Sequence, residues 1–222
     1  MGKIKKRLIV QPHSDDSLFS CSHVLFMPEY EVQVLTVESD ERRIQEDTKL
    51  FDFLKIPYHH LNVSFKDESY YGYNKLYSKD GITEEHVVDY LNEYFGEDKI
   101  NEIQQALKKW IKKFIKNNPD YTVIAPWGIG HPFHFFIRNV LQGMLNDLEY
   151  YREFPHSYKK RSQKQVEEQK QEYDLIRSVP VADFHEIKWK LAKTFYKSQS
   201  GLLFYEQGYI KKELPEEIYK KN

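Results

Sequence analysis

Two short clusters of histidine and aspartate have the residue types and spacing to bind a metal ion. The first is His-Ser-Asp-Asp at residues 13–16, and the second is His-Pro-Phe-His at residues 131–134. His13 and Asp16 are three residues apart at a turn. His131 and His134 have the same spacing at the start of an expected helix, so each pair can face one point. Two histidines and one carboxylate make a three-ligand site with an open position, as in catalytic zinc sites.

We therefore assign His13, Asp16 and His134 to a metal ion. Asp15 remains unligated beside it and is the expected general base for the metal-activated water. His131 is expected to stabilise the negative charge that develops on an attacked carbonyl oxygen. This set of groups suits the hydrolysis of an amide or ester.

Each cluster also has a purely structural interpretation. In the first, Ser14 is a helix N-cap and the two aspartates lie in the first turn, where the helix dipole favours carboxylates. That interpretation leaves His13 unexplained, because a cation gains nothing at the positive end of a helix. In the second cluster, Pro132 starts a helix and His131 caps it. A His-x-x-His motif alone is a weak signal, and the pairing with the first cluster strengthens it.

The elements that position these clusters alternate between strand and helix. The expected strands are 7–11, 31–38, 58–63, 121–127 and 149–154, and the expected helices are 17–27, 41–56, 100–118, 132–145 and 187–199. This alternation predicts an α/β fold with a mostly parallel sheet covered by helices on both faces. Both clusters directly follow a buried strand, and the carboxyl ends of such strands share one edge of the sheet. We therefore expect the clusters to meet there.

Composition narrows the function classes. The chain has 222 residues, 40% of them hydrophobic and 30% charged, which is typical of a globular domain with a sizeable core. The net charge of −1 gives no indication of a nucleic-acid partner. No apolar run approaches the roughly 20 residues of a membrane span. Cys21 cannot form an internal disulfide, so we expect it to be a buried small hydrophobe and the protein to be cytoplasmic.

The same segments resemble the PIG-L or LmbE-like deacetylases, metal-dependent enzymes that remove N-acetyl groups from N-acetylglucosamine conjugates. LIVQPHSDDSLFS resembles their His-Pro-Asp-Asp-Glu signature, and APWGIGHPFH resembles their His-Pro-Asp-His segment. EYYREFPHSY is similar to their Tyr-Glu-x-Pro-Tyr strand. The other matching positions are Arg43 and Glu46 of an Arg-x-x-Glu helix, and Lys188, Ala192, Tyr196, Ser198 and Gln199 of a late Lys…Ala…His-x-Ser-Gln helix. The matches follow the family's order over residues 7–63 and 121–210.

The resemblance implies a Rossmann-like, three-layer fold in one domain over residues 1–222, with 64–99 as an insertion or lid on the substrate side. It implies zinc, or in some members ferrous iron, as the cofactor. The family's ligands fall on His13, Asp16 and His134, its base on Asp15, and its oxyanion-stabilising histidine on His131. The implied substrate is an N-acylated amino-sugar conjugate.

Three positions depart from the family's motifs. Ser14 replaces a proline, Ser17 replaces the signature glutamate, and Phe133 replaces the aspartate of the second motif. None of these changes removes a ligand or the base. The loss of carboxylates that orient neighbouring groups can lower metal affinity or activity roughly 10–100-fold, so we predict a divergent member.

Two other functions remain open at this point. Ser17 and Phe133 also suit a glycan-binding or regulatory module that keeps the fold with weak or no catalysis. Two histidines and a carboxylate also form the facial triad of iron oxygenases, although the strand–helix alternation and the free Asp15 speak against that class.

Further residues have both a functional and a structural interpretation. Arg152 is expected to bind a substrate phosphate or hydroxyl, or to form a surface ion pair. His59 and His60 lie on a strand pattern and should face opposite sides of the sheet. The tyrosines proposed to stack on a sugar ring, or to pack an irregular loop, are Tyr70, Tyr71, Tyr73 and Tyr77.

Overall fold

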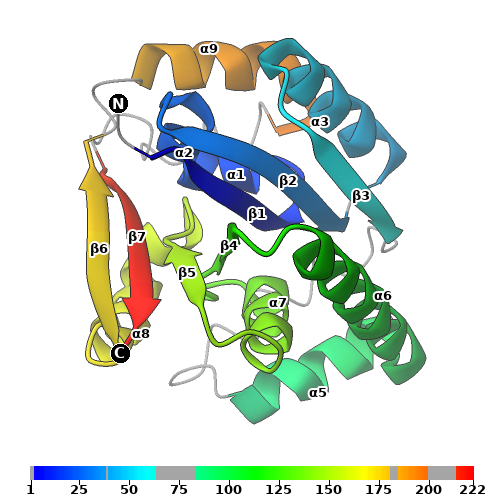
Figure 1. Cartoon of the computed structure of the whole chain (residues 1–222). Coiled ribbons are helices and arrows are strands. Elements are labelled where there is room, and N and C mark those ends of the chain that lie inside the picture. The colour runs from blue at the N-terminus through cyan, green and yellow to red at the C-terminus, as the bar shows by residue number, and fades with distance from the viewer. Residues whose placement is uncertain (1–2, 39, 64–83, 181–184, 200–213) are drawn as a thin grey trace.

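One seven-stranded sheet forms the centre of the molecule, with the strand order β3-β2-β1-β4-β5-β7-β6 (Figure 1). The structure is a computed structural model that describes residues 3–38, 40–63, 84–180, 185–199 and 214–222. The strands are β1 (Lys5–His13), β2 (Tyr30–Glu38), β3 (Tyr58–Val63), β4 (Tyr121–Pro126), β5 (Leu148–Tyr151), β6 (Tyr173–Val179) and β7 (Glu216–Lys221). All pairings from β3 to β5 are parallel, and β7 runs antiparallel to both β5 and β6. The predicted α/β class with a mostly parallel sheet is confirmed.

Helices cover both faces of the sheet and give three layers. The helices are α1 (Asp16–Ser20), α2 (Ser22–Phe26), α3 (Glu41–Leu54), α5 (Glu84–Phe95), α6 (Glu97–Asn117), α7 (Pro132–Gln142), α8 (Gln163–Gln169) and α9 (His185–Phe195). Leu8 and Val10 of β1 pack with side chains from α5, α6, α7 and α8, whereas Ile9 packs with α1, α2, α3 and α9. The alternation of side chains along a strand therefore places one core on each face. Figure 1 shows α9 and α3 on one side of the sheet and α5, α6 and α7 on the other.

Several elements differ from the expected ones. The predicted helix 17–27 is two short helices that break at Cys21, which lies in the core with no exposed surface. Strands β6 and β7 were not expected, because YDLIRSV contains the charged Asp174 and Arg177 and EEIYKK is charged at four of its six positions. They form the antiparallel edge of the sheet, where one strand side faces solvent and tolerates such residues.

The segment 64–99 was expected to be an insertion or lid. Residues 64–83 lie outside the described residues, and they include Tyr70, Tyr71, Tyr73 and Tyr77. The remainder contains α5, whose Val87, Tyr90 and Leu91 are buried in the core. The insertion or lid remains a prediction.

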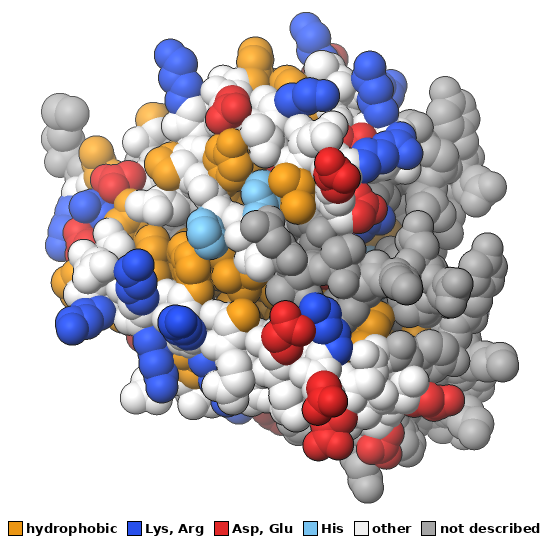
Figure 2. All heavy atoms as spheres, turned by 90° about the vertical axis from the view of Figure 1, so that its right-hand side faces the viewer, with side chains coloured by type: hydrophobic (Ala, Val, Ile, Leu, Met, Phe, Trp, Pro, Cys, Tyr) orange, Lys and Arg blue, Asp and Glu red, His pale blue; other side chains and the backbone are white. Residues whose placement is uncertain are grey.

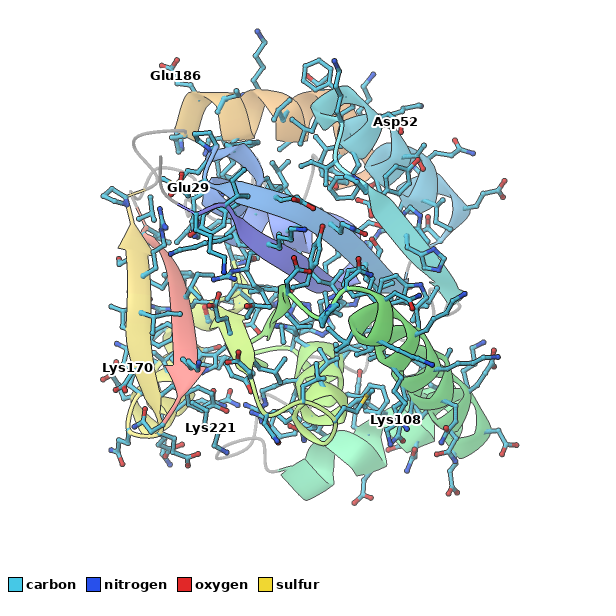
Figure 3. The ribbon with its side chains drawn as sticks, viewed as in Figure 1. Glu29, Asp52, Lys108, Lys170, Glu186 and Lys221 are labelled. Carbon is cyan, nitrogen blue, oxygen red and sulfur yellow. The ribbon has the colours of Figure 1, made fainter. Side chains whose placement is uncertain are left out.

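Charged side chains lie mostly at the outside. Lys170, Glu186 and Lys221 project away from the ribbon in Figure 3. Among the described helices, none combines the length and the apolar character needed to cross a membrane.

Candidate metal centre

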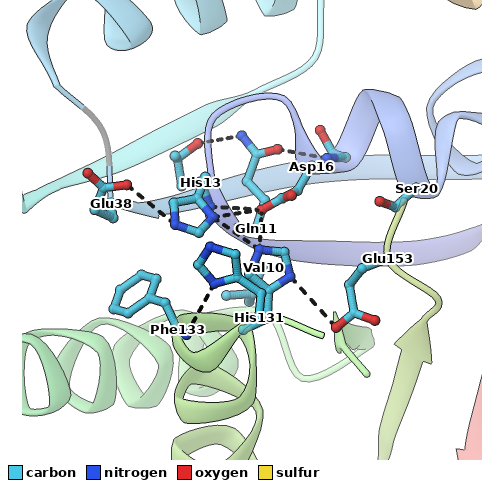
Figure 4. A network of polar contacts seen from close by, with 12 residues as sticks. Val10, Gln11, His13, Asp16, Ser20, Glu38, His131, Phe133 and Glu153 are labelled. Carbon is cyan, nitrogen blue, oxygen red and sulfur yellow. Dashed lines mark hydrogen bonds and ion pairs between the residues drawn. The ribbon is translucent and has the colours of Figure 1, made fainter. Parts of the chain in front are cut away.

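The two clusters meet at the carboxyl edge of β1 and β4. These strands are neighbours in the sheet, so the turn after β1 and the loop after β4 lie side by side. The loop needs glycine at position 130, where φ is +77° and a Cβ atom would lie 2.8 Å from the His156 carbonyl oxygen. α7 begins directly after this loop and carries His134 on its first turn. Figure 4 shows the histidines of both clusters facing one another.

Three potential ligand atoms converge at this point. His13 Nδ1 lies 3.0 Å from His134 Nε2 and 3.6 Å from Asp16 Oδ2. His134 Nε2 lies 3.4 Å from the same carboxylate oxygen. Asp16 Oδ2 also accepts a hydrogen bond of 2.8 Å from the His13 backbone N–H, which holds the carboxylate toward the histidines. The structure thus brings together the three residues that were expected to be ligands.

The spacing of these atoms fits a tetrahedral metal ion. Ligand atoms about 2.1 Å from a tetrahedral zinc ion lie about 3.4 Å from one another. The observed separations of 3.0, 3.4 and 3.6 Å are close to that value. Two imidazole nitrogens at 3.0 Å also need a proton or a cation between their lone pairs. Nitrogen atoms of His131 join the same cluster, since atoms from His13, His131 and His134 lie within 4.8 Å of one another and could hold a metal ion.

The electrostatics of the cluster keep the carboxylate charged. Burial raises the pKa of Asp16, but His134 and His13 outweigh it and hold that pKa below its usual value. Burial lowers the pKa of His134, but Asp16 and then Glu153 outweigh it and hold that pKa above its usual value. The Asp16 carboxylate and the His134 imidazole therefore stabilise each other's charged forms. A cation bound at this point would likewise require a charged carboxylate.

In both His13 and His134, the ring nitrogen that does not face the cluster lies near a carboxylate. Glu38 Oε2 lies 3.7 Å from His13 Nε2, and Glu153 Oε1 lies 3.7 Å from His134 Nδ1 (Figure 4). Glu153 is fully buried and also accepts hydrogen bonds from the backbone N–H groups of Gly128 and Ile129. Carboxylates in this position orient metal-ligating histidines and raise their basicity.

We expect Glu153→Gln to weaken zinc binding about 10–100-fold. The amide can still accept hydrogen bonds from the loop, but it no longer places a negative charge 3.7 Å from His134 Nδ1. Competition with a chromophoric chelator measures the affinity. The matched control is Glu149→Gln, which changes a partly buried glutamate paired with Arg7. Equal zinc affinities for the two variants would contradict an orienting role for Glu153.

Asp15 occupies an unusual position beside the cluster. It is the N-cap residue of α1, its backbone is left-handed at φ +93°, and its side chain makes no capping hydrogen bond to the helix. Burial raises the pKa of Asp15 well above its usual value and Asp16 adds to this, while Arg43 partly opposes it. A carboxylate with a raised pKa is a stronger proton acceptor than an ordinary one.

His131 is held as a neutral ring. Its Nδ1 accepts a hydrogen bond of 3.2 Å from the Phe133 backbone N–H, so in the neutral tautomer the ring proton is on Nε2. Burial lowers the pKa of His131 well below its usual value, and the neighbouring His134 and His13 lower it further. The ring can therefore donate a hydrogen bond from Nε2 at neutral pH.

Other residues of the matching motifs connect elements around the site. Glu46 of α3 accepts hydrogen bonds from the backbone N–H and the hydroxyl of Ser198. Arg152 forms a 2.7 Å ion pair with Glu217 and is 8% exposed, so the predicted ion pair exists but is buried rather than on the surface.

The two adjacent histidines of β3 face opposite sides of the sheet, as predicted. His60 lies 3.3 Å from Asp47 of α3, and the ring of His59 stacks at 5.2 Å on Trp110 of α6.

Figure 2 shows the molecule from the right-hand side of Figure 1. The strands β1, β2 and β3 point toward this side, so the surroundings of the site face the viewer. Histidine side chains reach the surface there among hydrophobic ones.

The sequence analysis missed three residues of the site, namely Glu38, Glu153 and His156. The ring centroid of His156 lies 4.9 Å from that of His131. Glu38 and Glu153 were findable, since both stand at or just past the carboxyl end of a strand at the same edge.

No family model and no curated protein matches the sequence. Solved structures do match in shape. One is a triple mutant of a deacetylase involved in the teicoplanin biosynthetic pathway, with 14% identity, a TM-score of 0.60, and 97% of this chain and 96% of that chain covered. Another is Dbv21, the deacetylase of the A40926 pseudoaglycone, with 15% identity, a TM-score of 0.57, and 98% and 97% covered. Over nearly its whole length, the chain has the fold of these deacetylases.

Proposed function

We propose that the chain is a metal-dependent amide hydrolase that removes an N-acyl group, in particular N-acetyl, from an amino-sugar conjugate. The observation that carries the proposal is the convergence of His13 Nδ1, Asp16 Oδ2 and His134 Nε2 within 3.0–3.6 Å. The deacetylase fold and the motif resemblance support the acylated amine as the reacting group.

In this proposal His13, Asp16 and His134 hold zinc or ferrous iron. When bound, the ion supplies a Lewis acid that polarises the acyl oxygen and lowers the pKa of water. Asp15 takes the proton from the attacking water and delivers it to the departing amine as the C–N bond breaks. His131 donates its Nε2–H to the acyl oxygen as negative charge develops there, which its neutral tautomer allows.

We expect the purified protein to bind one divalent ion per chain and to release acetate from N-acetylated amino-sugar conjugates. Removal of the metal with a chelator should abolish the release, and added zinc or ferrous iron should restore it. Metal analysis and an enzymatic acetate assay over a panel of conjugates measure both quantities. Protein that carries stoichiometric metal and releases no acyl group from the panel would contradict the proposal.

The second candidate is a glycan-binding module without turnover. Phe133 favours it, since this residue stands where the family has an aspartate and lies with its ring 5.4 Å from that of His13. Against it, Glu38 and Glu153 already provide carboxylates behind His13 and His134. Calorimetry on metal-free protein separates the two functions, because tight sugar binding without acyl release supports the module.

A further inference from the structure

The first helix after the metal cluster is not capped by the residue that should cap it. Asp15 occupies the N-cap position of α1, and aspartate is among the residue types that cap helices best. Its side chain nevertheless makes no capping bond, and its backbone has φ +93° and ψ −26°, a conformation that residues with a side chain rarely adopt. The N–H groups of the first turn therefore need another acceptor.

That acceptor is a side chain from the preceding strand. Gln11 Oε1 accepts a hydrogen bond of 2.9 Å from the Ser17 backbone N–H, at the second position of α1. Gln11 belongs to β1 and has no exposed surface. It thus makes the bond that the Asp15 carboxylate would make in an ordinary N-cap.

A buried network holds the amide of Gln11 in one orientation. Its Nε2 donates to Thr36 Oγ1 at 2.7 Å and to Asp47 Oδ2 at 2.9 Å. Asp47 is fully buried and also accepts from the Thr36 hydroxyl and the Tyr196 hydroxyl. A flipped amide would place its oxygen against the Asp47 carboxylate and its N–H₂ against the Ser17 N–H, so the network permits only the capping orientation.

We propose that Gln11 is a positioning residue that caps α1 in place of Asp15 and thereby leaves the Asp15 carboxylate available to accept a proton. This inference rests on the base role of Asp15 in the proposed function. The proposal also gives a role to the buried carboxylate of Asp47, which holds the Gln11 amide rather than a metal ligand.

The test is Gln11→Leu, which keeps the approximate size of the side chain and removes both its acceptor and its donors. We expect the crystal structure of this variant to show the Asp15 carboxylate within hydrogen-bond distance of the Ser17 N–H. The turnover number kcat should fall by at least about tenfold, up to the roughly 10²–10⁴-fold that a general base supplies. KM and the zinc dissociation constant should change less than about threefold, because Gln11 contacts no proposed ligand. Gln11→Met, which is more flexible, repeats the test if the leucine variant does not fold.

Two controls separate positioning from support of the fold. Gln142→Leu removes a glutamine that donates to Tyr150 and Tyr173 at the far end of α7, and its kcat should stay unchanged. In an Asp15→Asn background, Gln11→Leu should lower the residual rate less than about twofold, because the group it positions is already gone. A parallel fall of kcat, zinc affinity and the Asp15→Asn residual rate would overturn the inference, as would an Asp15 carboxylate that stays away from Ser17. If the wild type has no turnover, the proposed function fails, and the Asp15 conformation in the variant still decides whether Gln11 is the substitute cap.

Discussion

Replacing Asp15 with asparagine is expected to lower kcat for acyl-amide hydrolysis by about 10²–10⁴-fold, the contribution typical of a general base. Asparagine has the same shape but cannot accept the proton of the attacking water. The zinc content of the variant should equal that of the wild type, because the converging atoms belong to His13, Asp16 and His134. Steady-state kinetics together with metal analysis of the same preparation measure the effect.

The control is Asp52→Asn, at an exposed aspartate in the last turn of α3. It should leave both kcat and metal content unchanged. If Asp15→Asn retains more than about a third of the wild-type rate, another group is the base. If it loses its metal, Asp15 belongs to the ligand set and the proposed division between the two adjacent aspartates is wrong.

The meeting of the two clusters was predictable because it depends on topology alone. His13 and His134 are separated by 121 positions, yet each follows a strand that could be recognised as buried and parallel. In a parallel sheet all such ends lie on one edge, so the two loops needed only neighbouring strands to meet. β1 and β4 are indeed neighbours.

The sequence places Glu38 and Glu153 at the carboxyl edge of the sheet, but their contacts with the histidines were not predicted, because these depend on strand register. Glu38 lies opposite His13 in the pairing of β1 with β2, and a shift of one residue would turn it to the other face of the sheet. Glu153 faces His134 from the segment after β5. It stands in EYYREFPHSY, a matching motif that does not indicate which side chain the glutamate faces. Capping of α1 by Gln11 similarly depends on a left-handed Asp15, which sequence patterns do not reveal.

A second part of the matching motifs has a structural role. Lys188 of α9 donates hydrogen bonds of 2.6 Å to both Glu216 Oε1 of β7 and the Phe19 carbonyl oxygen at the end of α1. Glu216 also accepts from the Ser22 hydroxyl at 2.6 Å and the His23 backbone N–H at 2.9 Å. Lys188 and Glu216 are only 3% and 2% exposed, so this cluster joins α9, β7, α1 and α2 inside the core.

We expect Lys188→Met to lower the free energy of unfolding at pH 7 by about 3–5 kcal/mol, because it leaves the Glu216 charge buried without its cation. Methionine can occupy the space of the lysine's methylene carbons, and its helix propensity is similar. Urea denaturation measures the loss.

The control is Lys190→Met, at an exposed position of the same helix, which should change the free energy of unfolding by less than about 0.5 kcal/mol. The double variant Lys188→Met/Glu216→Gln should recover most of the loss. A double variant as unstable as the single one would show that lost packing, rather than the stranded charge, causes the effect.

The pH dependence of this loss distinguishes charge from packing in a second way. Burial raises the pKa of Glu216, but Lys188 and then His23 outweigh it and lower it to about 2. A folded-state pKa below the usual value of 4.5 means that wild-type Glu216 stabilises the fold fully above pH 4.5, and that this contribution declines as the pH falls toward 2. In Lys188→Met the lowering ammonium is gone, so the folded variant binds the proton at a higher pH and escapes the cost of the buried charge. The difference in unfolding free energy between wild type and variant should therefore shrink from pH 7 to pH 4, whereas a packing defect would leave it constant.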